Sequence, residues 1–411
     1  MIDFERFTLD NGLRVIVHRD TSTPIVAMNI VYNVGARDED PDLTGFAHLF
    51  EHLMFGGSKH IPRYDEVLEK VGGDNNAFTN NDITNYYLTV PKENLETAFW
   101  LESDRMYDLA FSPKSLEVQR NVVIEEYKQR YLNQPYGDVW LLLRPLVYKV
   151  HPYRWATIGK DISHIENAEM EDVKAFYKKF YNPSNAVMVI AGDVETEEIK
   201  RLSGKWFGPI DGGRPYERNL PQEPPQTQSR FLEVEREVPV NALFKVYHMC
   251  DRLHKDYYAT DLISDILSNG KSSRMNIELH KNQKLFSSVS AFISGDMDAG
   301  MFVVAGYLNE GVGFEEAAAG IERELKKLIE DGVGEKELEK VKNKVESAIT
   351  VSEVNVLDKA MNLAYFELLG DAAMANEEVA KYRMVTADDI KRVAAGMFTE
   401  NNVSTMFYKK I

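Results

Sequence analysis

Cysteine is almost absent from this chain of 411 residues, in which Cys250 is the only one. A single cysteine cannot form a disulfide within the chain. A disulfide-stapled fold is therefore excluded, and a reducing compartment is favoured. We interpret Cys250 as a small buried apolar residue rather than as a functional thiol.

Long apolar runs are also missing. A membrane-spanning helix needs roughly 20 consecutive apolar residues. The run Val139–Tyr148 is interrupted by Arg144, and Ala186–Ala191 has only the length of a strand. The first residues include no apolar segment of signal-peptide length. We therefore expect no membrane span and a cytoplasmic location, although a leader removed earlier would overturn the location.

Basic residues are outnumbered, since 48 Lys and Arg face 65 Asp and Glu, which gives a formal net charge of −17. Such a surface repels phosphate groups, so we expect no binding of nucleic acid. The remaining composition, 44% hydrophobic and 27% charged, is that of a globular protein. The length suits two domains of about 200 residues each.

A shift of composition separates these two domains. From Gly212 onward a turn with glycine and proline leads into a Pro- and Gln-rich stretch that ends near Gln228. This composition is typical of a linker. We predict a first domain over residues 1–211, a linker over 212–234 and a second domain over 235–411.

Local patterns predict a mixture of strands and helices in the first domain. β-branched and aromatic runs indicate strands, and amphipathic segments between capping residues and glycines indicate helices. The predicted strands are 14–18, 26–31, 76–90 and 186–191, and the predicted helices are 44–55, 64–71, 92–108, 113–132 and 171–181.

Three pairs of segments suggest that the second domain repeats the first. Residues 171–174 resemble 388–391 at an offset of 217, residues 49–57 resemble 262–270 at an offset of 213, and residues 115–126 resemble 337–348 at an offset of 222. Each match is weak alone, but all three occur in the same order. The fold class that follows is α+β, with two homologous units.

The chemistry concentrates in His48-Leu49-Phe50-Glu51-His52, on the helix predicted over 44–55. Histidines four residues apart project from one helical face about one turn apart. This spacing allows both imidazoles to bind one Zn²⁺ at roughly 2.0–2.1 Å. Glu51 then lies near the open position of the metal, where a carboxylate can accept a proton from water and pass it to a leaving amine.

A catalytic zinc ion needs a third protein ligand and one position left for water. The helix predicted over 113–132 offers Glu126, which shares one helical face with Val122 and Val123. Glu125 competes for this role, and spacing alone does not decide between the two.

The sequence around these residues resembles the M16 family, that of pitrilysin, insulysin and the mitochondrial processing peptidase. The resemblance extends over nearly all of the first half and, more loosely, the second. The segments that carry it are Asn11–Val15, Gly45–Phe55, Asn76–Thr79 with Asp82–Thr84 and Tyr86, Arg120–Glu126, and Asn182–Ala186 with Gly192-Asp193.

The resemblance implies two α/β-sandwich units, each a mostly antiparallel sheet covered by helices, that pair into a clam-like dimer around a chamber. It implies a zinc endopeptidase with one Zn²⁺ per chain, held by His48, His52 and Glu126, which favours Glu126 over Glu125, and with Glu51 as general base. The segment Asn76, Ala77, Phe78 and Thr79 would pair with the backbone of a peptide substrate.

The sequence departs from the family pattern at several positions. Family members often carry a carboxylate seven residues before the third ligand, where this chain has Gln119. We expect Gln119 and Asp82 to lie around the ligands and to tune them. In the second half, the repeat places Asp261, Ser264, Asp265 and Ala348 at the metal and base positions, so no second metal site is expected.

Catalytic members also carry an Arg and a Tyr in the second unit that bind the substrate carbonyl oxygen. His280 and Ser287 stand at these positions, and loss of such a donor typically costs about 10²–10³ in rate. A metal-free paralogue in a heterodimer could supply both residues, whereas a homodimer would have to use His280 or other donors. A non-catalytic scaffold subunit is the alternative function.

Overall fold

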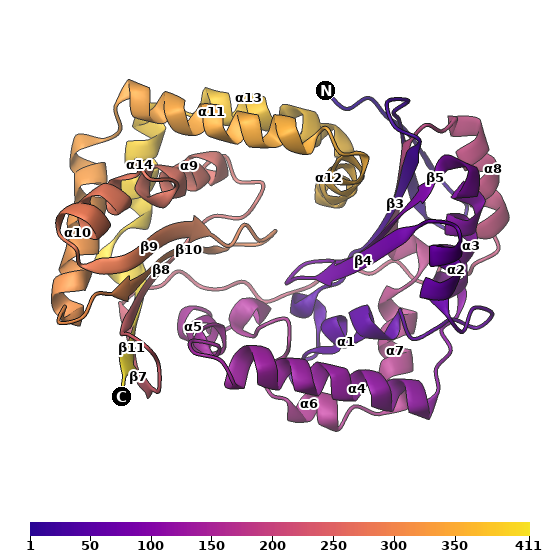
Figure 1. The fold of residues 1–411 in the computed structure, drawn as a ribbon, viewed down its shortest axis with the longest axis horizontal. Coiled ribbons are helices and arrows are strands. Elements are labelled where there is room, and N and C mark those ends of the chain that lie inside the picture. Colours follow the sequence, from indigo (N-terminus) through magenta and orange to yellow (C-terminus); the bar gives the residue numbers. More distant parts are fainter. The chain divides into compact units, whose positions relative to one another are not determined.

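The computed structural model describes every residue from Met1 to Ile411. Contacts within the chain divide it into two compact units. Unit 1 consists of residues 1–132, 155–221 and 350–376, and unit 2 consists of residues 133–154, 222–349 and 377–411. The α+β class with two similar units is confirmed (Figure 1).

Unit 1 is built on a six-stranded sheet in the order β1-β2-β6-β3-β5-β4. Only β2 and β6 run parallel, and the other neighbours are antiparallel. Every residue of β6 is buried, as a strand covered on both faces requires. Its strands are β1 (Glu5–Thr8), β2 (Arg14–Arg19), β3 (Ile25–Tyr32), β4 (Asp74–Thr79), β5 (Thr84–Pro91) and β6 (Ala186–Gly192).

The helices of unit 1 cover this sheet. In Figure 1, α3 and α8 lie on one side of the sheet and α12 on the other, while α1 contacts β4 and β5. The helices are α1 (Phe46–Leu53), α2 (Tyr64–Lys70), α3 (Leu95–Tyr107), α4 (Pro113–Tyr127), α6 (Ser163–Glu166), α7 (Met170–Phe180), α8 (Thr196–Trp206) and α12 (Val356–Leu369).

The single strand predicted over residues 76–90 is wrong in one respect, because the segment forms a hairpin of β4 and β5. The chain turns at residues 80–83, where the side chain of Asn80 accepts the backbone N–H groups of Asp82 and Ile83 at 2.8 and 2.9 Å. An asparagine that bonds its own following backbone favours a turn over a continued strand. As a result β4 becomes an edge strand.

Unit 2 has a five-stranded sheet in the order β7-β11-β8-β10-β9, in which only β7 and β11 are parallel. Both sheets therefore contain one parallel pair among antiparallel neighbours. The strands are β7 (Arg230–Arg236), β8 (Ala242–His248), β9 (Phe286–Ile293), β10 (Met301–Leu308) and β11 (Val403–Lys410). The helices are α5 (Val139–Val147), α9 (Tyr257–Ser268), α10 (Phe314–Asp331), α11 (Glu335–Ser352, which ends in unit 1), α13 (Glu378–Met384) and α14 (Ala387–Met397).

One helix from each half of the sequence covers the sheet of the other half. Helix α12 packs against β3 and β6 of unit 1, and α5 packs against β7, β8 and β11 of unit 2. The starts of α5 and α12 are 217 residues apart, the offset that also relates α7 to α14. The two helices are therefore equivalent in the repeat and exchanged between the units. Residues 133–154, which contain α5, belong to unit 2, and residues 350–376, which contain α12, belong to unit 1. A division of the chain at residues 212–234 places both segments in the other unit.

The exchange is held by specific contacts as well as by apolar packing. The buried residues of α12 are Val356, Ala360, Leu363, Ala364 and Phe366. Lys359 of the same helix donates to Asp20 at 2.6 Å, and both side chains are largely buried. No helix of the chain combines the length and the apolar composition that crossing a bilayer requires.

Candidate metal centre

Helix α1 begins at an unusual backbone position. Its N-cap, Gly45, has φ of +91°, and a Cβ atom there would lie 2.8 Å from the carbonyl oxygen of Ile158. Any larger residue would be strained and crowded. The carboxylate of Glu39 accepts the N–H groups of Gly45 and Ala47, both at 2.9 Å. A buried acid thus satisfies donors of the first turn, which orients the helix that carries the HxxEH residues.

The structure brings together His48, His52 and Glu126, whose donor atoms lie within 4.8 Å of one another. Oε2 of Glu126 is 3.5 Å from Nε2 of His48 and 3.3 Å from Nε2 of His52. Glu125 points elsewhere, because its carboxylate pairs with Lys128 at 2.7 Å. Two imidazoles and one carboxylate from adjacent helices converge on one point. The spacing of the histidines predicts their shared helical face, whereas the choice of Glu126 over Glu125 rests on the family resemblance.

The electrostatics of this cluster fit a divalent metal. Burial lowers the pKa of His48 to about 4, although the neighbouring Glu126 opposes this shift. The hydrogen bond from His52 holds the pKa of Glu126 below its usual value. A neutral imidazole and an ionised carboxylate are the forms that bind metal. The donor set of two His and one Glu is also one that zinc accepts in catalytic sites, so the residues present fit a zinc ion.

Glu51 lies half-buried on α1 between the two histidines in sequence. Burial raises the pKa of its carboxyl group, while Thr79 and the imidazole of His52 oppose the rise. An acid whose pKa moves toward neutrality is suited to both accepting and donating a proton. Helix α1, which carries Glu51, also contacts β4, whose last residue is Thr79.

The strand β4 pairs with β5 alone, so its other edge has no strand partner. The N–H of Ala77 is accepted by the side chain of Asn76 at 2.8 Å, and Phe78 is an exposed aromatic residue beside it. An unpaired edge with backbone donors and acceptors can receive an extended peptide. The substrate-binding role of Asn76–Thr79 stays a prediction, and the edge is the geometry that it requires.

The two residues expected around the ligands lie in different surroundings. Gln119 is half-buried on α4, two turns before Glu126. Asp82 is buried and forms an ion pair with the buried guanidinium of Arg37 at 3.1 Å. Their effect on the ligands stays a prediction. Sequence reasoning missed Arg130, whose Nη1 lies 2.8 Å from Oε1 of Glu126. Its signal was the i, i+4 spacing from the ligand.

Sequence reasoning also missed a cluster of Tyr86, Arg105 and Glu102 that stabilises α1. The hydroxyl of Tyr86 donates to the carbonyl oxygen of Phe50 at 3.1 Å. The buried guanidinium of Arg105 lies 4.5 Å from the centre of the Tyr86 ring and pairs with Glu102 at 2.7 Å. No local pattern reveals this cluster, because its members come from α1, α3 and β5.

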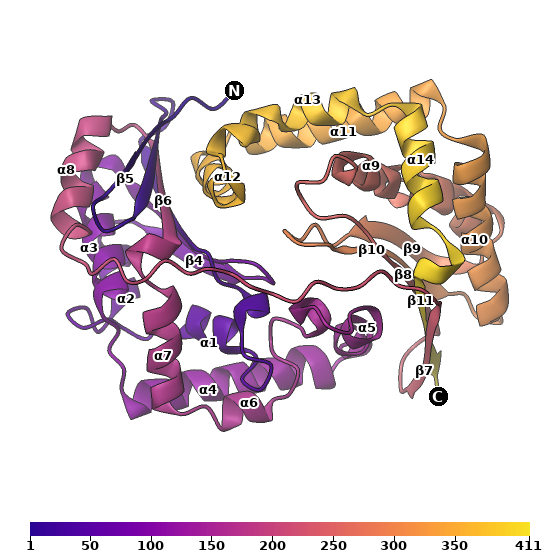
Figure 2. The ribbon, with the colours of Figure 1, turned by 180° about the vertical axis from the view of Figure 1, so that it is seen from behind.

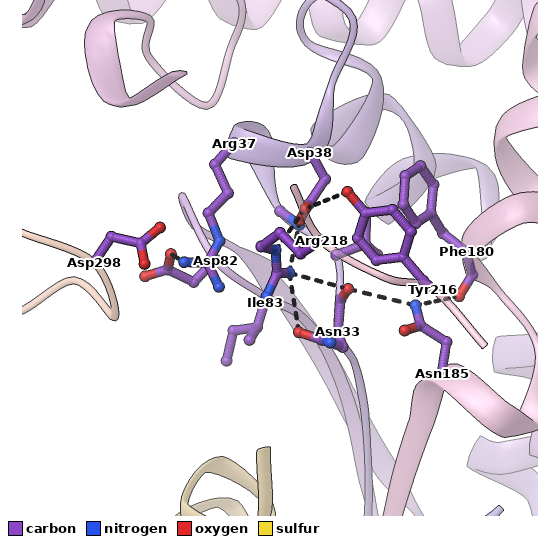
Figure 3. Close-up of polar contacts among 12 residues, drawn as sticks. Asn33, Arg37, Asp38, Asp82, Ile83, Phe180, Asn185, Tyr216, Arg218 and Asp298 are labelled. Atoms are coloured by element: carbon purple, nitrogen blue, oxygen red, sulfur yellow. Dashed lines mark hydrogen bonds and ion pairs between the residues drawn. The ribbon is translucent and has the colours of Figure 1, made fainter. Parts of the chain in front are cut away.

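Tyr216 and Arg218, near the point where the chain leaves unit 1, bind Asp38 in the segment just before α1. Figure 3 shows Arg218 and Tyr216 directed at Asp38. Arg218 donates to both carboxylate oxygens of Asp38 at 2.8 and 3.0 Å, and the hydroxyl of Tyr216 donates at 3.0 Å. Arg218 also donates to the side chain of Asn33 at 3.0 Å. Asp38 precedes Glu39, so this network anchors the residue that caps α1.

The second half of the chain has no comparable cluster of metal-binding side chains. Asp261, which stands where the repeat would place His48, accepts the hydroxyl of Tyr382 at 2.5 Å. His280 contacts the carbonyl oxygen of Phe286 at 2.9 Å, and Ser287 donates to the carbonyl oxygen of Tyr307 at 3.1 Å. Cys250 is half-buried, and burial raises the pKa of its thiol to about 11, which fits an unreactive role.

Two family models match the chain. Residues 14–137 match the model described as insulinase (peptidase family M16), and residues 167–345 match the model described as the peptidase M16 inactive domain. The first match contains the whole metal cluster, whereas the second covers the part of the chain in which the repeat has lost those residues.

Named relatives and solved structures agree with these matches. The zinc protease PqqE of Helicobacter pylori is 29% identical over 413 aligned residues, which cover 98% of this chain and 92% of that protein. A zinc protease of Bacillus subtilis, YmxG, is 25% identical over 403 residues, which cover 97% of this chain and 96% of that protein. The crystal structure of a protease from Helicobacter pylori superposes with a TM-score of 0.93 at 28% identity, with both chains fully covered.

Proposed function

The chain belongs to the M16 family of peptidases, and we propose that it is a zinc-dependent endopeptidase that hydrolyses peptides or unfolded segments. The observation that carries the proposal is the convergence of donor atoms of His48 and His52 on α1 and of Glu126 on α4, which lie within 4.8 Å of one another. Relatives that span the same length are named zinc proteases, which supports peptidase activity in general.

In this proposal one zinc ion would be held by His48, His52 and Glu126. Zinc with three protein ligands supplies Lewis acidity that activates water and polarises a carbonyl group. Glu51 accepts the proton of the attacking water and then donates it to the amine that leaves. Its raised pKa makes the second transfer easier than it would be for an exposed glutamate.

The substrate is bound in extended form along the free edge of β4. Backbone groups of Asn76–Thr79 pair with the peptide backbone, which gives affinity without requiring a particular sequence. This arrangement sets the scissile bond near Thr79, the residue of β4 whose contacts influence Glu51.

Peptide hydrolysis by matched variants tests the proposal. Glu51→Gln keeps the size of the side chain and removes the proton acceptor, so we expect zinc to be retained and kcat to fall about 10²–10⁴-fold. Glu126→Gln should lose zinc, whereas Glu125→Gln, one residue away and paired with Lys128, should retain both zinc and activity. Full activity of Glu51→Gln would overturn the assignment of the base.

We further propose that the active species is a dimer, either of two copies or with a metal-free paralogue that supplies the missing Arg and Tyr. The presence of His280 and Ser287 at those positions supports the heterodimer. Size-exclusion chromatography with mass analysis of the chain expressed alone decides between the two. An active homodimer would contradict the need for a paralogue.

His280 and Ser287, in place of the usual Arg and Tyr, also favour a second candidate function, that of a scaffold subunit without catalysis. A scaffold has no use for the complete set of two histidines and two glutamates, which is why we place it second. If the purified protein contains no zinc, or hydrolyses no peptide with any partner, the scaffold function becomes the better hypothesis. A cytoplasmic location remains a prediction, which fractionation of the source cells would test.

A further inference from the structure

One exposed face of α4 carries an unusual sequence of side chains on either side of Glu126. Val118 and Val122 lie two turns and one turn before it and are 49% and 43% exposed. Arg130 follows one turn later, in a π-helical turn formed by residues 128–132, with 70% of its side chain exposed. Apolar side chains thus stand before the metal ligand and a cation after it.

The valines are not required by the core of unit 1. The residues of α4 that are buried are Leu116, Val123 and Tyr127, which share a different face of the helix. Charged pairs flank the two valines on α4, where Glu117 pairs with Arg120, and Glu125, which also lines the hollow beside Glu126, pairs with Lys128. Val122 therefore lies one turn before Glu126, beside the same hollow, and Val118 lies one turn further from the metal centre.

This face is continuous with the metal centre. Oε2 of Glu126 faces the two imidazoles, while Oε1 of the same carboxylate faces Nη1 of Arg130. A shallow hollow of about 410 Å³ adjoins Glu126 and is lined by Asn121, Val122, Glu125, Glu126 and Gln129. In Figure 1 and Figure 2, α4 runs beside α1 on the same side of unit 1.

We propose that this face of α4 is a specificity-determining wall of the substrate groove, which selects extended peptides by polarity. An apolar side chain lies against Val118 and Val122, and a carboxylate side chain lies against Arg130, on opposite sides of the scissile bond. The inference rests on the proposed peptidase function and adds the class of peptide that the site prefers.

The spacing of the two contacts sets the spacing in the peptide. Val122 and Arg130 are eight residues apart, or roughly 12 Å along a helix. An extended peptide rises about 3.3 Å per residue. The preferred peptide therefore carries its acidic residue about three to four positions from its apolar residue.

The test uses ten-residue peptides that contain one Phe and, at each spacing from two to five residues on either side, Asp, Asn or Lys. Binding is measured by fluorescence anisotropy to Glu51→Gln protein loaded with zinc, and cleavage is measured with the unsubstituted enzyme. We expect the Asp peptide to bind and to be cleaved better than the Lys peptide at one spacing near three or four.

Substitutions on the proposed wall should change preference rather than only rate. Arg130→Gln should reduce the preference for Asp over Asn about 3–10-fold, as an exposed ion pair allows, and Arg130→Glu should reverse the preference between Asp and Lys. Val122→Ser should reduce the preference for Phe over Ala about fivefold. Lys128→Gln, at a lysine that pairs with Glu125 and not with Glu126, should change neither ratio.

Loss of zinc would reduce the cleavage of all peptides alike, whereas a change of selectivity alters the ratio of binding or cleavage between two peptides. Zinc content is measured for every variant by mass spectrometry. If Arg130→Glu keeps the Asp-to-Lys ratio of the unsubstituted protein, the inference is overturned while the peptidase proposal survives. If the ratios of binding shift as expected but no peptide is cleaved, recognition by α4 stands and the proposed hydrolysis fails.

Discussion

The carboxylate of Glu39 accepts the backbone N–H of Ala47, the residue directly before His48, at 2.9 Å. The same carboxylate accepts the N–H of Gly45. Burial raises the pKa of Glu39 to about 8, although these two amides oppose the shift. The protonation of Glu39 is therefore coupled to helix α1, which carries His48, Glu51 and His52, three of the four candidate site residues.

The first prediction concerns stability and pH. The pKa of Glu39 in the folded chain lies above the ordinary value of 4.5, so folding takes up a proton between about pH 4.5 and pH 8. The contribution of Glu39 to stability is then complete below pH 4.5 and is lost as pH rises through 8. The free energy of unfolding should therefore fall as pH rises toward 8. In Glu39→Gln, which cannot titrate at this position, the fall should be smaller by about 2–4 kcal/mol.

Urea unfolding at pH 5, 6.5 and 8 measures the effect. Glu69→Gln, at an exposed position of α2, is the control and should leave the pH dependence unchanged. Parallel curves for Glu39→Gln and the unsubstituted protein would show that Glu39 does not take up a proton on folding.

The second prediction concerns metal removal. Chelation should abolish peptide hydrolysis and lower the melting temperature, because a ligand present at 1,000 times its Kd stabilises the folded state by about 4 kcal/mol. Addition of one equivalent of zinc should restore both. His52→Asn should resemble the chelated protein without chelator, whereas His254→Asn, at an exposed histidine of unit 2, should not. Unchanged melting of chelated protein would speak against a resident metal.

The third prediction concerns the anchor of the segment before α1. Asp38 has a fully buried side chain, and Arg218 is its cationic partner. Arg218→Gln leaves this carboxylate buried without a counter-charge, which should cost about 3 kcal/mol of unfolding free energy. Arg214→Gln, at an exposed position of the same stretch, should cost less than about 0.5 kcal/mol.

The same variants test whether the anchor reaches the site. Because Asp38 adjoins Glu39, we expect Arg218→Gln to lower kcat more than it raises KM, at a temperature where the protein is fully folded. A variant that loses stability but keeps kcat would show that the anchor serves the fold alone.

The HxxEH residues illustrate what sequence could determine. Four-residue spacing on a helix places two imidazoles on one face wherever that helix lies, because helix geometry is local. β-branched runs between turns predicted the strands β2, β3 and β6. Spacing alone left both Glu125 and Glu126 open as the third ligand, and only the family resemblance favoured Glu126. The sequence also specified the repeat, since collinear matches fall on α1 and α9, α4 and α11, and α7 and α14.

Other features followed from contacts between distant segments. Glu39 caps α1 from outside any capping motif, Arg105 supports it from α3, and α5 and α12 each cover the sheet of the other half. Periodicity shows that a helix has an apolar face, but the surface that this face covers depends on the whole chain. The sequence by itself therefore determined the α+β class and indicated the candidate ligands. Only the tertiary structure decided how the helix that carries His48 and His52 is held, because burial and long-range hydrogen bonds exist only once the chain has folded.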